Sequence, residues 1–136
     1  MGELIERATL SVQQPWAWLI VHNFKPVENR SWATKFRGVL NIHAGKTFDR
    51  EGHDWVRANF PHLDLPELFD VGGIVGTVEQ HGCVTRLESP WFFGPYGHLM
   101  RAGEPCELIP CRGQLGYFAA HGPLRAARPE VPNVHP

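Results

Sequence analysis

The feature of this chain that most constrains its fold is the order of its predicted helices and strands. Helical spacing of apolar residues predicts helices at residues 15–23 and 49–60, and a further helical turn fits 61–72. Alternation predicts strands at 8–12, 38–44, 73–80 with an extension up to 84, 96–101, 106–110 and 113–119, with an extended segment at 25–30 and a turn at 102–105. Helices and strands do not alternate, which argues against a Rossmann-like sheet. This order favours an α+β fold, a small mixed β-barrel of five or six strands with two or three helices.

The size of the chain suits one domain. Its 136 residues, 43% of them hydrophobic, can form a core that needs neither disulfides nor a structural metal. From residue 122 onward the chain holds four prolines and few apolar residues. We therefore predict a domain over residues 1–121 and a mobile Pro-rich tail over 122–136.

The spacing of the cysteines and histidines argues against a disulfide-rich protein and against a metal-binding protein. The three cysteines form no C-x-x-C pair, and the start of the chain does not resemble a signal peptide, so we expect a cytoplasmic protein with no membrane contact. The eight histidines are scattered and match no metal-ligand spacing. We expect no metal and no other cofactor, and we favour a monomer, although the sequence does not fix the oligomeric state.

Basic residues are concentrated in one segment, although the net charge of the chain is −1. Residues 25–50 hold six lysines and arginines against two acidic residues, and Trp32, Phe36 and His43 are interleaved with them. A ligand that carries a phosphate and a base would fit such a segment. The alternative is a solvated basic loop that faces the acidic residues of segment 51–80.

Lys25, Glu28 and Arg30 form the densest group of candidate functional residues. Strand alternation places Glu28, Arg30 and Trp32 on one face, and Lys25 at the preceding turn can reach that face. We predict that the three charged residues form one functional cluster in a cleft. The alternative is an ion pair that serves only the structure.

Further candidates lie on the third predicted strand and in an aromatic loop. His43 shares a strand face with Asn41, and Lys46 follows shortly after. The loop at 89–97 holds four aromatic residues, of which some can stack on bases. For Phe92 or Phe93 we favour a role in plugging one end of the barrel. A protein-interaction surface built on this loop is a further alternative.

Several segments, taken together, resemble the ASCH domain, a PUA-like family named for its homology to a transcriptional coactivator. The resemblance covers residues 10–20, 25–46, 72–79, 89–100 and 110–118, and suggests a small bacterial-type member. The family hallmark G-x-K-x-x-E-x-R falls on residues 23–30, with Asn23 where the family usually has glycine. Because Asn also tolerates a left-handed backbone, the turn should be preserved.

The resemblance implies a PUA-like barrel with a cleft beside the first helix, and RNA or a modified nucleoside as ligand. We therefore expect an RNA- or nucleotide-binding protein with a basic cleft. The expected ligand-binding residues are Gln14, Trp16, Arg30, Trp32, His43, Lys46, Trp91 and Tyr96.

The resemblance also suggests an enzyme as an alternative. Some small members are amidohydrolases that act on N4-acylated cytidines with a Lys and a Thr of the hallmark segment and a distant Glu, and ribonuclease activity is ascribed to others. Lys25 matches that Lys, whereas Glu28 stands where the nucleophilic Thr would be. In a hydrolase of either kind, Lys25 and Glu28 would be the catalytic residues.

Overall fold

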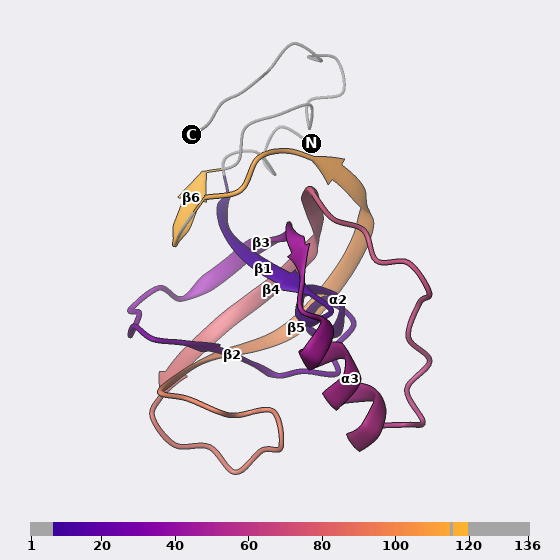
Figure 1. Ribbon diagram of the computed structural model, residues 1–136. Helices are drawn as coiled ribbons and strands as arrows, with labels where there is room; N and C mark the ends of the chain where they lie inside the picture. Colours follow the sequence, from indigo (N-terminus) through magenta and orange to yellow (C-terminus); the bar gives the residue numbers. More distant parts are fainter. Residues whose placement is uncertain (1–6, 115, 120–136) are drawn as a thin grey trace.

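One curved sheet organises the computed structural model, which describes residues 7–114 and 116–119 (Figure 1). Its six strands have the order β2-β5-β4-β3-β1-β6, in which β1 and β3 are parallel and the other pairs antiparallel. The α+β class and the mixed sheet predicted from the sequence are confirmed. The strands are β1 (Ala8–Gln14), β2 (Val27–Arg30), β3 (Gly38–Phe48), β4 (Gly73–Val84), β5 (Tyr96–Pro110) and β6 (Tyr117–Ala119), and the helices are α2 (Trp16–Val21) and α3 (Arg50–Asn59).

Both helices form where the apolar spacing predicts them, and each begins at a polar partner. In α2 the Trp18 N–H donates to Gln14 Oε1 over 2.8 Å. In α3 the Asp49 carboxylate accepts from the Gly52 N–H over 2.9 Å, which satisfies one of the amides that a helix N-terminus leaves unpaired. Helix α3 ends before Pro61, as expected.

The turn after α2 explains why asparagine can replace the usual glycine of the hallmark. Asn23 has a φ of 68°, in the left-handed region that Asn tolerates better than most residues. Its side-chain amide pairs with the backbone of Gly103 on β5, accepting over 2.7 Å and donating over 3.0 Å. Asparagine therefore keeps the turn and adds two hydrogen bonds that join it to the sheet.

The turn predicted at residues 102–105 is wrong, because one continuous strand, β5, replaces the two predicted strands around it. Ala102 has a φ of 54°, and the register with β4 shifts between Ile74 and Gly76 and again between Thr77 and Glu79. Irregularities of this kind bend a strand without reversing its direction. Figure 1 shows β5 as a long curved ribbon.

The sheet is not closed into a barrel by backbone hydrogen bonds. Among the described residues, the edge strands β2 and β6 are not paired with each other. Side chains bridge this open edge instead. Arg30 Nη2 donates to the Ser11 carbonyl over 2.6 Å, and the rings of Trp32 and Tyr117 lie 5.5 Å apart. The sheet therefore curls far enough to bring its two edges together, but side chains form the contact.

Two apolar clusters support this arrangement. One lies within the curved sheet and includes Leu10, Ile42 and Val78, and the other joins the two helices to the loop at 85–95. In the second cluster Trp91 stacks on Phe60, with ring centroids 4.3 Å apart. No helix in the described part of the chain is long and apolar enough to cross a membrane. The predicted tail, 122–136, lies outside the described residues.

Buried His98 should make the stability of the domain depend on pH. Its Nε2 lies 3.0 Å from the Trp32 carbonyl and its Nδ1 3.4 Å from the Tyr117 hydroxyl, at the open edge. Burial lowers the pKa of His98 below its ordinary 6.5, so the unfolded chain binds more protons and stability falls as the pH drops below 6.5.

We therefore expect the melting temperature to fall between pH 7 and pH 5, and less steeply in His98→Asn than in wild type. Part of the dependence should remain in that variant, because burial also lowers the pKa of His43. His62→Asn, at an exposed position, is the control. Identical pH dependence in wild type and His98→Asn would contradict the prediction.

Candidate functional site

A cleft of about 680 Å³ opens beside the unclosed edge of the sheet. Its walls come from β1, β2, the end of β3 and the segment before β6, together with Trp16 at the start of α2. A volume of this size lies within the usual range for small-molecule sites. A smaller pocket of about 190 Å³ adjoins it and shares Trp16, Glu28 and Asn29 with it.

Lys25, Glu28 and Arg30, which the sequence analysis groups together, lie in contact with one another. Lys25 Nζ lies 3.1 Å from Glu28 Oε1 and donates to the Val27 carbonyl over 2.6 Å. Glu28 Oε2 lies 3.3 Å from Arg30 Nε. Lys25 is 3% exposed and Glu28 8%, so this is a buried ion pair and not a surface pair.

The burial of Lys25 determines the electrostatics of the cluster. Burial lowers the pKa of Lys25, and the neighbouring Glu28 carboxylate partly offsets that effect. Glu28 lines both the cleft and the smaller pocket, whereas Lys25 lines only the smaller one. The cleft is therefore lined by Glu28 and Arg30, with Lys25 behind the carboxylate.

Arg30 is anchored without a ligand. Its Nη2 donates to the Ser11 carbonyl across the open edge. Its Nε, although 3.3 Å from Glu28, is not aligned for a hydrogen bond and has no hydrogen-bond partner within the described part of the chain. An arginine held in place loses little conformational entropy when it binds an anion.

Trp16 is held equally firmly at the other side of the cleft. Its indole Nε1 donates to Asp49 Oδ2 over 2.9 Å, and the same carboxylate caps α3. A Cβ on Gly52 would lie 2.3 Å from the Trp16 ring, so only glycine lets α3 approach so closely. Trp16 borders both the cleft and the smaller pocket, and thus presents a fixed aromatic surface to a ligand.

Trp32 and Lys46 complete the group of predicted residues that the fold brings together. Trp32 lines the cleft and packs edge-on against His98, with centroids 4.8 Å apart. Lys46, near the end of β3, is exposed and lines the same cleft. The predicted Trp16, Arg30, Trp32 and Lys46 therefore share one cleft with Glu28.

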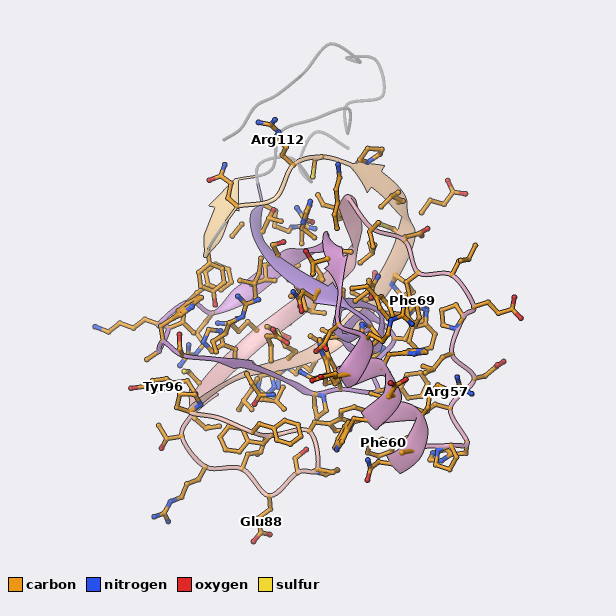
Figure 2. The ribbon with its side chains drawn as sticks, in the orientation of Figure 1. Arg57, Phe60, Phe69, Glu88, Tyr96 and Arg112 are labelled. Carbon is orange, nitrogen blue, oxygen red and sulfur yellow. The ribbon has the colours of Figure 1, made fainter. Side chains whose placement is uncertain are left out.

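Four of the predicted ligand-binding residues lie elsewhere. Gln14 is buried, and its amide caps α2 and donates to the Asp70 carbonyl over 2.8 Å. His43 is buried behind the cleft wall. Trp91 belongs to the second apolar cluster. Tyr96 opens β5 and points away from the body of the protein (Figure 2).

The cleft also contains polar residues that sequence reasoning missed: Ser11, Gln13, Asn29, Ser31, Thr47 and Gln114. Strand alternation could have identified the first two, because Ser11 and Gln13 alternate with buried Leu10 and Val12 on β1 and therefore lie on its other face. The others become neighbours only through the order of the strands.

Asn29 connects the cleft to the aromatic loop. Its Oδ1 accepts from the amides of Phe93 and Gly94, over 2.8 and 3.0 Å, and its Nδ2 donates to the Trp91 carbonyl over 3.0 Å. Phe92 packs against the second apolar cluster, but Phe93 is 63% exposed and lines the smaller pocket beside Lys25. The two phenylalanines therefore have different surroundings.

Among the described residues, no group of three or more His, Cys, Asp or Glu side chains is arranged to hold a metal ion. The chemistry available to the cleft is that of its cations, its one carboxylate, its aromatic rings and its amide and hydroxyl groups.

Comparisons with known proteins agree with this architecture. The ASCH domain family matches residues 10–93. Activating signal cointegrator 1 from Mus musculus is 35% identical over 85 residues and that from Homo sapiens 34%, and each match covers 58% of this chain but only 15% of the relative. The crystal structure of a mutant of the ZmASCH protein from Zymomonas mobilis has a TM-score of 0.52 at 16% identity, covering 77% of this chain and 76% of the other. At that identity the likeness concerns the fold alone.

Glu28→Gln should destabilise the domain, because it leaves the Lys25 ammonium buried without its charge partner. We expect a loss of roughly 3–5 kcal/mol near pH 7, measured by urea unfolding. The loss should shrink as the pH rises toward 10.5, the ordinary pKa of lysine, because Lys25 then folds unprotonated and no longer needs a carboxylate. Glu79→Gln breaks the exposed Glu79–Arg101 pair and should cost far less. Equal costs for the two variants would show that the buried pair has no special role.

Proposed function

The chain belongs to the ASCH domain family, and from this membership and the geometry of the cleft we propose that it binds RNA or a nucleotide-like ligand there. One observation carries the proposal. A single cleft of suitable size combines two cations, Arg30 and Lys46, with two tryptophans, Trp16 and Trp32. A ligand with a phosphate and a flat base uses both kinds of group at once.

The phosphate would lie between Arg30 and Lys46. Arg30 is a fixed donor, whereas Lys46 is an exposed ammonium that can move toward the anion. Glu28 offsets one of the two positive charges, which leaves a local excess of one in the cleft. Because the net charge of the whole chain is −1, binding depends on this local charge and not on a general attraction to polyanions.

The base would stack on Trp16 or Trp32. The hydrogen bond from Trp16 to Asp49 fixes the plane of its ring, so stacking costs little side-chain entropy. The amides of Gln13, Asn29 and Gln114 line the same cleft and offer donors and acceptors to a base edge or a ribose hydroxyl. We place this binding in the cytoplasm, supported by three cysteines that are all free thiols.

Lys46→Ala tests the phosphate contact. We expect weaker binding of a short single-stranded RNA, measured by fluorescence anisotropy over a series of salt concentrations. The slope of log K against log salt should become shallower by about 0.7, the value for one released counterion. Lys35→Ala, an exposed basic residue of the same segment that does not border the cleft, is the matched control. If both variants behave alike, the RNA contacts the basic segment without using the cleft.

A hydrolase is the second candidate, and the lowered pKa of buried Lys25 favours it. In this candidate Lys25 is a general base that Glu28 positions from 3.1 Å away. Wild-type protein should then convert N4-acetylcytidine to cytidine or cleave RNA, and Lys25→Met should abolish turnover while remaining folded. Wild-type protein that binds RNA but turns over neither substrate would exclude this candidate and leave the binding function intact.

A further inference from the structure

A serine and a histidine with no role in the proposed binding form a close pair at the edge of the cleft. Ser11 on β1 lies directly opposite His43 on the parallel strand β3. Ser11 Oγ is 3.0 Å from His43 Nδ1, and His43 Nε2 is 2.8 Å from the Cys111 carbonyl oxygen. Three groups therefore follow one another within hydrogen-bond distance: a hydroxyl, an imidazole and a carbonyl.

The carbonyl determines where the imidazole carries its proton. A carbonyl oxygen can only accept, so the short contact to Cys111 requires the proton on Nε2. In the neutral ring Nδ1 then has a lone pair, which faces the Ser11 hydroxyl. Burial lowers the pKa of His43, so the neutral ring predominates at neutral pH.

The two side chains differ in their exposure to solvent, and this difference suits catalysis. His43 is 3% exposed, whereas Ser11 is half-buried and lines the cleft. Gly113 covers the pair closely, since a Cβ there would lie 2.6 Å from His43 Cε1 and 3.0 Å from Ser11 Oγ. Ser11 thus borders the ligand space, while the imidazole beside it is shielded from water.

We propose that Ser11 is a nucleophile for acyl transfer and His43 its general base, and that the cleft hydrolyses carboxylic esters. A nucleophile within hydrogen-bond reach of a base that a third group orients is the usual arrangement for covalent catalysis. The inference goes beyond nucleotide binding and does not depend on it, because its nucleophile and base are Ser11 and His43, oriented by the carbonyl of Cys111.

The reaction balances with water as the only co-reactant. Ser11 Oγ attacks the ester carbonyl carbon, and the hydroxyl proton passes to His43 Nδ1. The bond between the carbonyl carbon and the alkoxy oxygen then breaks, and the departing alcohol takes the proton from Nδ1. Water attacks the acyl-serine, its proton passes through Nδ1 to Ser11 Oγ, and a carboxylic acid leaves. The Arg30 guanidinium, hydrogen-bonded to the Ser11 carbonyl, lies at the same cleft to stabilise negative charge on the substrate.

The Cys111 carbonyl, the group that orients His43, limits the class of substrate that the pair can cleave. A backbone carbonyl orients the imidazole but carries no net charge, so it stabilises the imidazolium less than the carboxylate of a Ser-His-Asp triad. An amide needs stronger assistance than an ester because its leaving group is poorer. Esters are therefore the substrate class that this pair can cleave.

Covalent labelling of the full chain tests the proposal. A fluorophosphonate probe should label Ser11, located by peptide mass spectrometry, and p-nitrophenyl acetate should be hydrolysed with a burst. Ser31, an exposed serine of the same cleft, is an internal control and should be labelled at least about 100-fold more slowly, the low end of what a positioned base contributes. Ser11→Ala should remove the label, and His43→Gln should slow it by roughly the same factor.

The wild-type result alone is decisive, even if His43→Gln fails to fold. No label on Ser11, or labelling of Ser11 and Ser31 at equal rates, would overturn the proposal. A folded His43→Gln variant that is labelled as fast as wild type would also overturn it. RNA binding of wild-type protein, measured separately, distinguishes the two proposals: labelled Ser11 without RNA binding rejects only the binding function, and the reverse result rejects only the nucleophile.

Discussion

The burial of one ammonium group, that of Lys25, determines the geometry of the cleft. A buried cation is tolerated only where a charge partner and a hydrogen-bond acceptor meet it, and here Glu28 and the Val27 carbonyl serve. Glu28 is therefore not free to swing out, and its second oxygen faces Arg30. Arg30 in turn reaches across the open edge to β1. A continuous series of polar contacts thus runs from the turn after α2 to the far side of the sheet.

The helices serve the cleft as much as the core. Helix α3 begins at Asp49, whose carboxylate both caps the helix and orients Trp16. Helix α2 carries Trp16 at its first position and ends at the turn that introduces the Lys25–Arg30 segment. The aromatic and the charged sides of the cleft are consequently attached to the two ends of one six-residue helix, which fixes their relative position.

Local patterns in the sequence predict the helices and the alternation of Glu28, Arg30 and Trp32, because caps and strand periodicity depend on neighbours in the chain. Local patterns fail where contacts between distant segments determine the structure. Ala-Gly-Glu-Pro reads as a turn, but pairing with β4 keeps β5 continuous through it. Gln14 and Trp91 carry side chains typical of a site, yet burial in this fold assigns them to other contacts. Asn29 acts on residues more than sixty positions away, which no local pattern reveals.

The open edge between β2 and β6 has a mechanical consequence. In a closed barrel, widening the interior means breaking a ladder of backbone hydrogen bonds. Here side-chain contacts hold the edges together, among them the Arg30–Ser11 hydrogen bond and the contacts of Tyr117 with Trp32, His98 and Gln80. The gap can therefore widen by rotation of a few side chains while every strand keeps its neighbour. The width of the cleft can therefore change at the expense of a few side-chain contacts and without loss of the fold.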